Sequence, residues 1–468
     1  MDEDIANFAL QELLKEASYA EVRLEDTQHT NFTLKNSALQ GVDSSRVNGL
    51  GMRFINKGIM GFVSTNNLSR DNVREIIKQS MLTVQRGQKI AEKINLSQEK
   101  AHVDKFAAIQ KQKVQDVSTE DKLRILKEAD KALPKETTPA RYLSMTDSLT
   151  KEHLLTSEGT KITQIIPKVN FFYYLTLKHE NKLAQRYWDY GAVGGYEHFK
   201  KWNLPGILEQ ESTSMQNVMK NGIKAPTGPV DVVVAPQVTG IMVHESCGHP
   251  LEADRIFGRE AAQAGESFIK ADMVGKRIGS EHVTIVDDPT VEHGYGFFKY
   301  DNEGVKARKK ILYENGLVKE FLHNRETAAH MNLPSNGSSR ATDYDKESIV
   351  RMSNTYLLQG KFTEEELVKS VKKGVFIKNF NEWNIDDIRY NQKYVGANAY
   401  MIENGEITTP VLNPTIEITT PKLWGSVNGV AKNFELHAGN CGKGEPMQAI
   451  PVLFGGPSMR LSNIRLSQ

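Results

Sequence analysis

The sequence predicts an α+β fold, in which an N-terminal and central region of helices and antiparallel sheet (1–220) precedes a mostly antiparallel β region (221–468) with one apolar helix. In the first region, hydrophobic periodicity alternates between helical spacing and a period of two. The second region is rich in short β segments and Asn-Gly turns. A Pro/Gly break, NGIKAPTGP (221–229), separates the regions, and a further boundary is expected near 90–117.

The first elements follow from this periodicity. Residues 3–16 place apolar side chains at helical spacing and predict a helix. Between 20 and 65 the segments AEVRLED, TNFTLKN and GLGMRFI alternate with a period of two and predict strands. The last of these begins a hairpin with Asn56-Lys57-Gly58 at its tip, and a helix is expected to start near Ser69.

A polar connection (88–116) leads to the central elements. Ser118 and Asp121 occupy capping-box positions and predict the start of an amphipathic helix. The segment from about 138 to 190 reads as strands, with turns at SEG (157–159) and HEN (179–181). One helix is expected over EHFKKWNLPGILEQESTSMQNVMK.

The C-terminal region begins with a short apolar strand, DVVVAP, followed by the apolar, helix-length segment PQVTGIMVHESCGHPLEADRIF. Hairpin tips are expected at Asn315-Gly316 and Asn404-Gly405, and Asn428-Gly429 is a third Asn-Gly pair of this kind. Short strands flank these pairs, which indicates a mostly antiparallel arrangement.

Composition excludes several classes of protein. The chain has 468 residues, 59 Lys+Arg and 58 Asp+Glu, a net charge of +1, so it has no electrostatic reason to bind nucleic acid or anionic lipid strongly. No apolar run approaches the roughly 18 residues of a membrane span, and MDEDIANFAL lacks the basic start of a signal peptide. Two cysteines, Cys247 and Cys441, cannot build a disulfide framework. We therefore expect a soluble cytoplasmic protein.

The segment IMVHESCGHPLE holds His244, Glu245 and His249. Histidines five residues apart are about 140° out of line on an ideal α-helix, but a π-type turn would bring them together. Pro250 removes a backbone donor directly after His249, and Gly248 relaxes the chain beside it. The spacing is therefore compatible with metal chelation where the helix is interrupted. The alternative is two core histidines with ordinary hydrogen bonds.

A catalytic zinc site usually has three protein ligands and an open fourth position. Cys441, in the Gly-rich stretch GNCGKGEP, is the best third candidate, because a thiolate binds Zn²⁺ well and the flanking glycines let the chain approach an ion. Glu245 would act as the general base that takes a proton from a water attacking a peptide carbonyl. Cys247 is a competing ligand, but a small packed residue is the preferred interpretation.

These residues lie in a longer pattern. VHESCGHPLEADRIF resembles the metal-binding segment of the TldD/PmbA family, whose members are often labelled modulators of DNA gyrase. Four further stretches match in order: YDNEGVKARKKILYENGLVKEFLHNRETAA, RMSNTYLLQG, AYMIENGEITTPV and GNCGKGEPMQAIPV. The resemblance covers 225–468 closely and 1–220 by element order. The chain is similar to the TldD side of the family, because it retains His-Glu-x-x-x-His and the late Cys-Gly-Lys.

The resemblance implies a cytoplasmic zinc metallopeptidase that cleaves unstructured peptides. It implies that His244, His249 and Cys441 are ligands of Zn²⁺ and that Glu245 is the base. It further implies a dimer, either with a second copy or with a PmbA/TldE-like paralogue that lacks the ligands. At Cys247 and Pro250 the chain departs from the small or apolar residues typical of bacterial members. This departure leaves the ligand residues unchanged and affects only the expected geometry of the helix around them.

Other residues have two interpretations each. Glu252 and Asp254 would orient an imidazole, or they would lie on a solvated helix face or pair with Arg255 or Arg259. The stretch RMSNTYLLQG would line the substrate groove, with Tyr356 near the oxyanion, or it would form a strand with a buried tyrosine, which is the favoured reading. The residues concerned in this stretch are Arg351, Asn354 and Tyr356.

The leading functional hypothesis is a zinc-dependent peptidase acting on unfolded or short peptides. The alternative is a non-catalytic adaptor or modulator in which the same residues hold a structural metal. A nucleic-acid-binding modulator is disfavoured by the balanced charge, and no membrane partner is expected.

Overall fold

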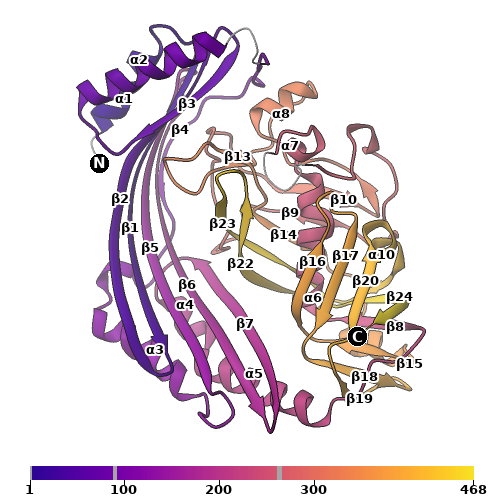
Figure 1. Ribbon diagram of the computed structural model, residues 1–468. Helices are drawn as coiled ribbons and strands as arrows, with labels where there is room; N and C mark the ends of the chain where they lie inside the picture. Colours follow the sequence, from indigo (N-terminus) through magenta and orange to yellow (C-terminus); the bar gives the residue numbers. More distant parts are fainter. Residues whose placement is uncertain (1–2, 88–91, 261–265, 468) are drawn as a thin grey trace.

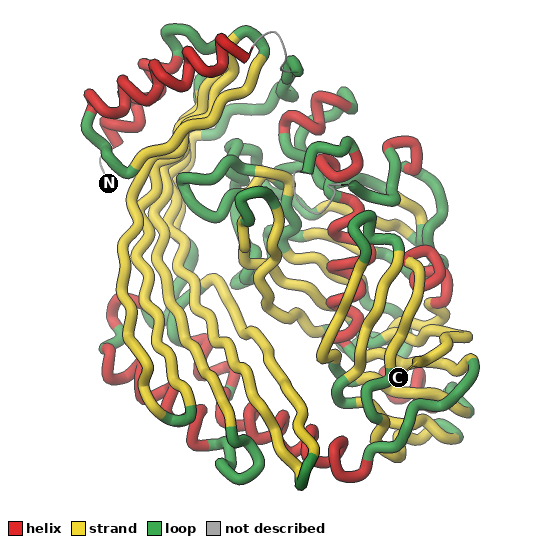
Figure 2. The backbone as a smooth tube through the Cα atoms, viewed as in Figure 1, coloured by secondary structure: helices red, strands yellow, loops and turns green. Residues whose placement is uncertain are grey.

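The computed structural model describes residues 3–87, 92–260 and 266–467. It has the predicted α+β architecture. Figure 1 shows a long, bowed sheet formed by the N-terminal residues, with helices at both of its ends, beside a C-terminal part built from shorter strands. Figure 2 shows the same division by secondary structure, with most of the yellow strands in these two bodies. No helix among the described residues is both long and apolar enough to cross a bilayer.

The N-terminal part contains these elements in order: α1 (Glu3–Leu13), β1 (Tyr19–Lys35), β2 (Ala38–Asn56), β3 (Ile59–Thr65), α2 (Arg70–Gly87), β4 (Val103–Ala107), the 3₁₀ turn η1 (Val114–Asp116), α3 (Thr119–Lys131), β5 (Ala140–Thr156), β6 (Lys161–His179), β7 (Lys182–Val193), α4 (Glu197–Trp202) and α5 (Leu204–Asn221). The strand order in its sheet is β3-β2-β1-β5-β6-β4, and β7 pairs with β6. The pairs are antiparallel except β4 with β6.

Two apolar clusters occupy opposite ends of this sheet. At one end α1 and α2 cover the start of β1 and the end of β2, where Leu24 and Met52 are fully buried. At the other end α3 and α5 cover one face, with Phe32 and Leu143 in the core. Each cluster needs apolar side chains from only part of a strand, so the strands can be long and polar between them.

Most of the predicted N-terminal elements are confirmed, including the turn at Lys57-Gly58 and the cap of α3, where the Ser118 side chain accepts from the Asp121 N–H. Two differ. The segments 20–26 and 30–36 are one continuous strand, β1, because β2 and β5 pair with it throughout. The single helix expected before the boundary is two helices, because Asn203 adopts a left-handed conformation between α4 and α5.

The C-terminal part contains these elements in order: β8 (Pro229–Val234), α6 (Pro236–Val243), the π-helix η2 (His244–Gly248), the 3₁₀ turn η3 (His249–Leu251), α7 (Ala253–Ile256), the 3₁₀ turn η5 (Ala271–Met273), β9 (Ile285–Asp287), β10 (Lys310–Glu314), β11 (Leu317–Val318), α8 (Arg325–His330), β12 (Ser339–Arg340), β13 (Ile349–Val350), β14 (Asn354–Leu357), α9 (Glu364–Lys369), β15 (Lys373–Ile377), β16 (Phe380–Ile385), β17 (Asn391–Gly396), β18 (Ala399–Glu403), β19 (Glu406–Val411), β20 (Thr415–Thr419), α10 (Thr420–Ser426), β21 (Val427–Val430), β22 (Glu435–Lys443), β23 (Gln448–Gly456) and β24 (Met459–Ser467).

Two sheets frame α6. One has the order β11-β10-β9-β14-β23-β22, and the other has the order β16-β17-β20-β24-β8-β15-β18-β19, with β21 paired to β24. Helix α6 leaves β8 and packs on β14, β23 and β22. Gly240 makes this approach possible, because a Cβ there would lie 2.7 Å from the Phe454 ring and 2.9 Å from the Gly455 backbone. The apolar helix is therefore held directly behind the edge strand β22.

Asn315-Gly316 and Asn404-Gly405 form the predicted hairpin tips, and all four residues have positive φ angles. The interpretation of Asn428-Gly429 as a third such turn is wrong. This pair lies inside β21, whose pairing with β24 is irregular between Val427 and Gly429. A strand neighbour supplied by the chain terminus outweighs the local turn preference here.

Candidate metal and catalytic centre

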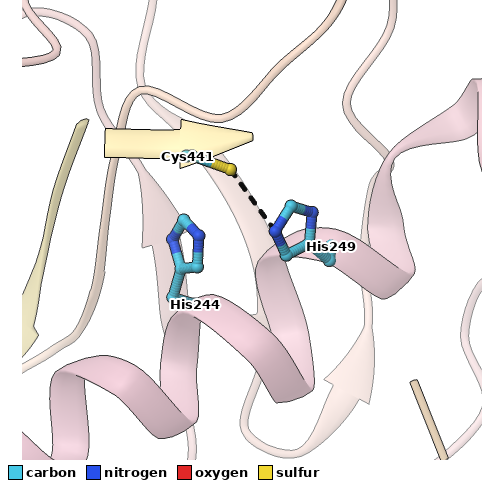
Figure 3. Close-up of side chains that lie close together, drawn as sticks. All are labelled: His244, His249 and Cys441. Carbon is cyan, nitrogen blue, oxygen red and sulfur yellow. Dashed lines mark hydrogen bonds between the residues drawn. The ribbon is translucent and has the colours of Figure 1, made fainter. Parts of the chain in front are cut away.

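The two histidines are brought together by an interruption of the helix. The backbone N–H of His249 donates to the carbonyl of His244, a five-residue step that defines the π-helix η2. The imidazole centroids lie 4.8 Å apart with an interplanar angle of 80°. The predicted π-type turn is therefore confirmed, and Figure 3 shows both rings on the same side of the helix.

Cys441 approaches these rings from β22. Its Sγ lies 3.4 Å from Nε2 of His249, and one donor atom from each of the three residues lies within 4.8 Å of the others. Figure 3 shows the thiol above the two rings. Arg351 fixes the strand, since its guanidinium donates to the carbonyl of Cys441 and, over 2.8 Å, to that of Gln448 on β23.

The donor set fits a zinc ion. In a tetrahedral site with Zn–N of about 2.0–2.1 Å and Zn–S of about 2.3 Å, the donors lie roughly 3.3–3.6 Å from one another. Nδ1 of His244 is buried without a hydrogen-bond partner, and burial lowers the pKa of this imidazole, which favours its neutral form. Burial opposes ionisation of Cys441, but the charges of His249 and Arg351 outweigh it and lower the thiol pKa to about 7.

Glu245 lies beside the three residues with its carboxylate held on two sides. Its Oε1 accepts from the indole N–H of Trp383 over 3.1 Å, and its Oε2 lies 3.7 Å from the Arg389 guanidinium with no hydrogen-bond partner. Burial by itself would raise the pKa of Glu245, but the charge of His249, together with that of Arg389 and the hydrogen bond from Trp383, outweighs it and lowers the pKa. The carboxylate form is favoured at neutral pH.

Glu252 orients the second imidazole. Its Oε2 lies 2.9 Å from Nδ1 of His249 and accepts from Arg255 Nε over 3.0 Å. Burial would raise the pKa of Glu252, but the charge of Lys443, followed by those of His249 and Arg255, holds it well below its ordinary value. Both expected contacts of Glu252, with an imidazole and with Arg255, are thus present at once.

Asp254 contacts Lys443 instead of a histidine. The ammonium lies 2.7 and 2.8 Å from the two carboxylate oxygens, 3.3 Å from Glu252 and 3.6 Å from Glu260. These groups are buried, so the solvated helix face expected as an alternative is not what the structure shows. Lys443 is the last residue of the Cys-Gly-Lys pattern, which assigns it no role of its own, and it lies two residues from Cys441 on a strand and therefore faces the same side.

A cavity of about 350 Å³ opens beside the His-His-Cys group. Its walls come from distant parts of the chain, namely β7 of the N-terminal sheet, the β16–β17 hairpin, β22, β23 and α6 with η2. Sequence patterns did not identify several of its lining residues, and no local signal points to them: Tyr187, Trp188, Asp189, Trp383, Arg389 and Asn440.

The remaining candidates lie outside the lining of this cavity. Arg351 acts on the backbone of β22 and β23, as described above. The Asn354 amide donates to the Asp288 carbonyl and accepts from the Gly296 N–H, and the Tyr356 hydroxyl donates to the Asp288 carboxylate. This is the favoured sequence interpretation of the stretch, a strand with a buried tyrosine. Cys247 is buried in the apolar core, as preferred, and burial raises its thiol pKa.

Family comparisons cover most of the chain. Residues 227–468 match the PmbA/TldA metallopeptidase C-terminal domain, 20–83 match domain 1 of the same family, and 112–213 match its central domain. A metalloprotease of Methanocaldococcus jannaschii is 31% identical over 456 residues, 96% of this chain and 97% of the relative. A zinc metalloprotease TldD homolog of Saccharolobus solfataricus is 30% identical over 263 residues, 55% of this chain and 57% of the relative.

Solved structures share the fold. A putative modulator of a DNA gyrase from Thermotoga maritima has a TM-score of 0.80 at 18% identity, with 100% of both chains covered. TldE from Thermococcus kodakarensis has a TM-score of 0.75 at 16% identity, with 100% of this chain and 99% of that chain covered.

Proposed function

The chain belongs to the PmbA/TldD metallopeptidase family, and we propose that it is a zinc-dependent peptidase that hydrolyses unfolded or short peptides. The observation that carries this proposal is the convergence of His244, His249 and Cys441, with Glu245 beside them at the wall of one cavity. The naming of one relative as a zinc metalloprotease supports the choice of metal.

In this proposal His244, His249 and Cys441 hold the zinc ion. A bound zinc ion would supply Lewis-acid polarisation of the scissile carbonyl and would acidify a water molecule. The chain supplies the orientation of the ligands. Glu252 fixes the plane of the His249 ring through Nδ1 and leaves Nε2 facing the thiol. Arg351 fixes the backbone that carries the thiol.

Glu245 would take the proton of the attacking water at Oε2. That oxygen has no hydrogen-bond partner, whereas Oε1 is engaged by Trp383. Arg389, at 3.7 Å, favours the carboxylate over the carboxylic acid. A base must be ionised before it can accept a proton, so these contacts suit the role.

The shape of the cavity supports a flexible substrate. The cavity, of about 350 Å³, lies between strands of three separate sheets and the helix α6 with η2, and it suits a short stretch of extended chain. We propose that the active form is a dimer, with a second copy or with a TldE-like paralogue. The likeness to a TldE structure supports a shared fold for such a pair.

A direct test uses the full chain loaded with zinc, a quenched fluorescent peptide and an unfolded protein substrate. Glu245→Gln should retain about one zinc per chain and lose hydrolysis by roughly 10²–10⁴-fold. His244→Ala should lose both zinc and hydrolysis, and Glu406→Gln, at an exposed hairpin tip, is the matched control.

The outcomes separate the peptidase from the adaptor. Normal hydrolysis by Glu245→Gln would refute the assigned base. A wild-type chain that binds zinc stoichiometrically and cleaves neither substrate, alone or mixed with a TldE-like partner, would favour a structural metal in an adaptor.

A further inference from the structure

One face of the N-terminal sheet is polar and lies toward the C-terminal part, and its side chains range from half-buried to exposed. On β5 the side chains of Leu143, Met145 and Leu149 are buried toward α3 and α5, whereas Ser148 and Thr150, of opposite orientation, are only half-buried. This face carries hydroxyls, with Thr27 and Thr150 hydrogen-bonded across the strands over 3.0 Å.

A cleft of about 390 Å³ lies over this face. Its floor includes a cross-strand row in which His29 opposes Ser148 and Ser148 opposes Lys168. Its opposite wall is the β22–β23 hairpin, through Asn440 and Pro451. In Figure 1 the long strands bow around this hairpin.

The cleft adjoins the cavity of the metal and catalytic centre at two points. Asn440, next to Cys441, lines both spaces. Asn170 of the cleft donates to the carboxylate of Asp189, which lines the cavity, over 3.2 Å. The two spaces therefore meet around the edge strand β22.

We propose that this cleft is a second substrate subsite, which holds the extended polar chain of a peptide whose scissile bond lies at the His-His-Cys group. The proposal rests on the proposed peptidase function. The hydroxyl and amide groups of the floor would hydrogen-bond the peptide backbone and polar side chains. Lys168 and Asp343 both line the cleft, so hydrogen bonding rather than net charge would hold the chain.

The geometry predicts how long a peptide must be to reach from the cavity into the cleft. Asp189 opposes Phe172 on β6, and Lys168 lies four residues further along that strand. At about 3.3 Å per residue this step is about 13 Å, or roughly four residues of extended peptide beyond the cavity. Peptides confined to the cavity would gain nothing from the cleft. Longer polar chains would gain binding energy remote from the scissile bond.

The experiment compares peptides with one common cleavable core in the zinc-loaded full chain. The core is used alone, or extended by about eight residues of Ser, Thr, Asn and Gln at either end, or by about eight of Leu and Ala. We expect a polar extension at one end to raise kcat/KM by roughly tenfold through KM, and the apolar extension to raise it less. Ser148→Trp and His29→Trp, which fill the floor, should reduce the long-to-short ratio to about one.

Leu183→Trp introduces the same side chain at a 68% exposed position on β7 and should keep the wild-type ratio. Equal kcat/KM for short and long peptides in the wild type, or a long-to-short ratio unaltered by both floor variants, would overturn the subsite. His29 is exposed, so its variant serves if Ser148→Trp does not fold.

Binding separates this proposal from the catalytic one. Fluorescence anisotropy of the same peptides on zinc-loaded Glu245→Gln requires no turnover. Length-dependent binding that His29→Trp abolishes supports the cleft even if hydrolysis is never observed. Length-independent binding rejects the cleft and leaves the peptidase proposal standing.

Discussion

Oε2 of Glu252 lies 2.9 Å from Nδ1 of His249, in a pair that is fully enclosed by protein. The contact determines which ring nitrogen of His249 faces Cys441, because a hydrogen bond at Nδ1 leaves Nε2 as the free donor atom. The same carboxylate contacts Arg255 and Lys443. The orientation of one proposed ligand thus depends on a buried ionic cluster.

Glu252→Gln should weaken zinc binding by about 10–100-fold, because the amide is a poorer acceptor for the imidazole N–H. Competition with a chromophoric chelator measures the Kd. Glu406→Gln is the control, since Glu406 is exposed. Equal affinities for the two variants would show that Glu252 does not orient the imidazole.

Lys443→Met should lower the free energy of unfolding by about 3–5 kcal/mol, because it leaves Asp254 buried without its cation. Urea unfolding followed by circular dichroism measures the change. Adding Asp254→Asn should recover part of the loss, and Lys422→Met, at an exposed position, should have little effect. A double variant as unstable as the sum of the single variants would argue against direct pairing.

The thiol of Cys441 should titrate near neutrality in the metal-free chain. Its pKa is lowered from an ordinary 9.0 to about 7, so the stability that comes from the thiolate is present above the ordinary pKa and is lost as pH falls through about 7. Below that pH, zinc affinity should fall by about tenfold per unit as protons compete for the sulfur.

Ultraviolet thiolate absorbance of the metal-free protein follows this titration. Cys441→Ser should remove the step near pH 7, whereas Cys247→Ser should retain it, because burial raises the pKa of Cys247. If the step near pH 7 disappears only in Cys247→Ser, the titrating thiol is Cys247 and the prediction for Cys441 is wrong.

Gly248→Ala should destabilise the chain by about 1–3 kcal/mol and reduce zinc occupancy. A Cβ at this position would lie 1.9 Å from Sδ of the fully buried Met352, so the π-helix that aligns the histidines would have to shift. Combining it with Met352→Ala should restore zinc content, measured by elemental analysis, relative to Gly248→Ala alone. No restoration would mean that the glycine is needed for the backbone rather than for space.

Features that depend on neighbouring residues were predictable from the sequence. The interruption beside Pro250 follows from a missing donor and a crowded carbonyl within one turn, and it produced the π-helix that turns His244 and His249 to one side. The cap at Ser118 and the Asn-Gly tips at 315–316 and 404–405 are equally local. Their energies are set within a few residues, so a pattern of residue types is enough.

Features that depend on residues distant in the chain were not predictable from the sequence. Asn428-Gly429 has a strong turn preference but lies in a strand, because β24 supplies a partner for its backbone. Trp383, Arg389 and Asp189 reach the cavity from two different sheets, and their own surroundings in the sequence do not mark them. The thiol of Cys441 meets the imidazoles only because β22 is the edge strand behind α6, and that adjacency comes from the packing of the whole sheet.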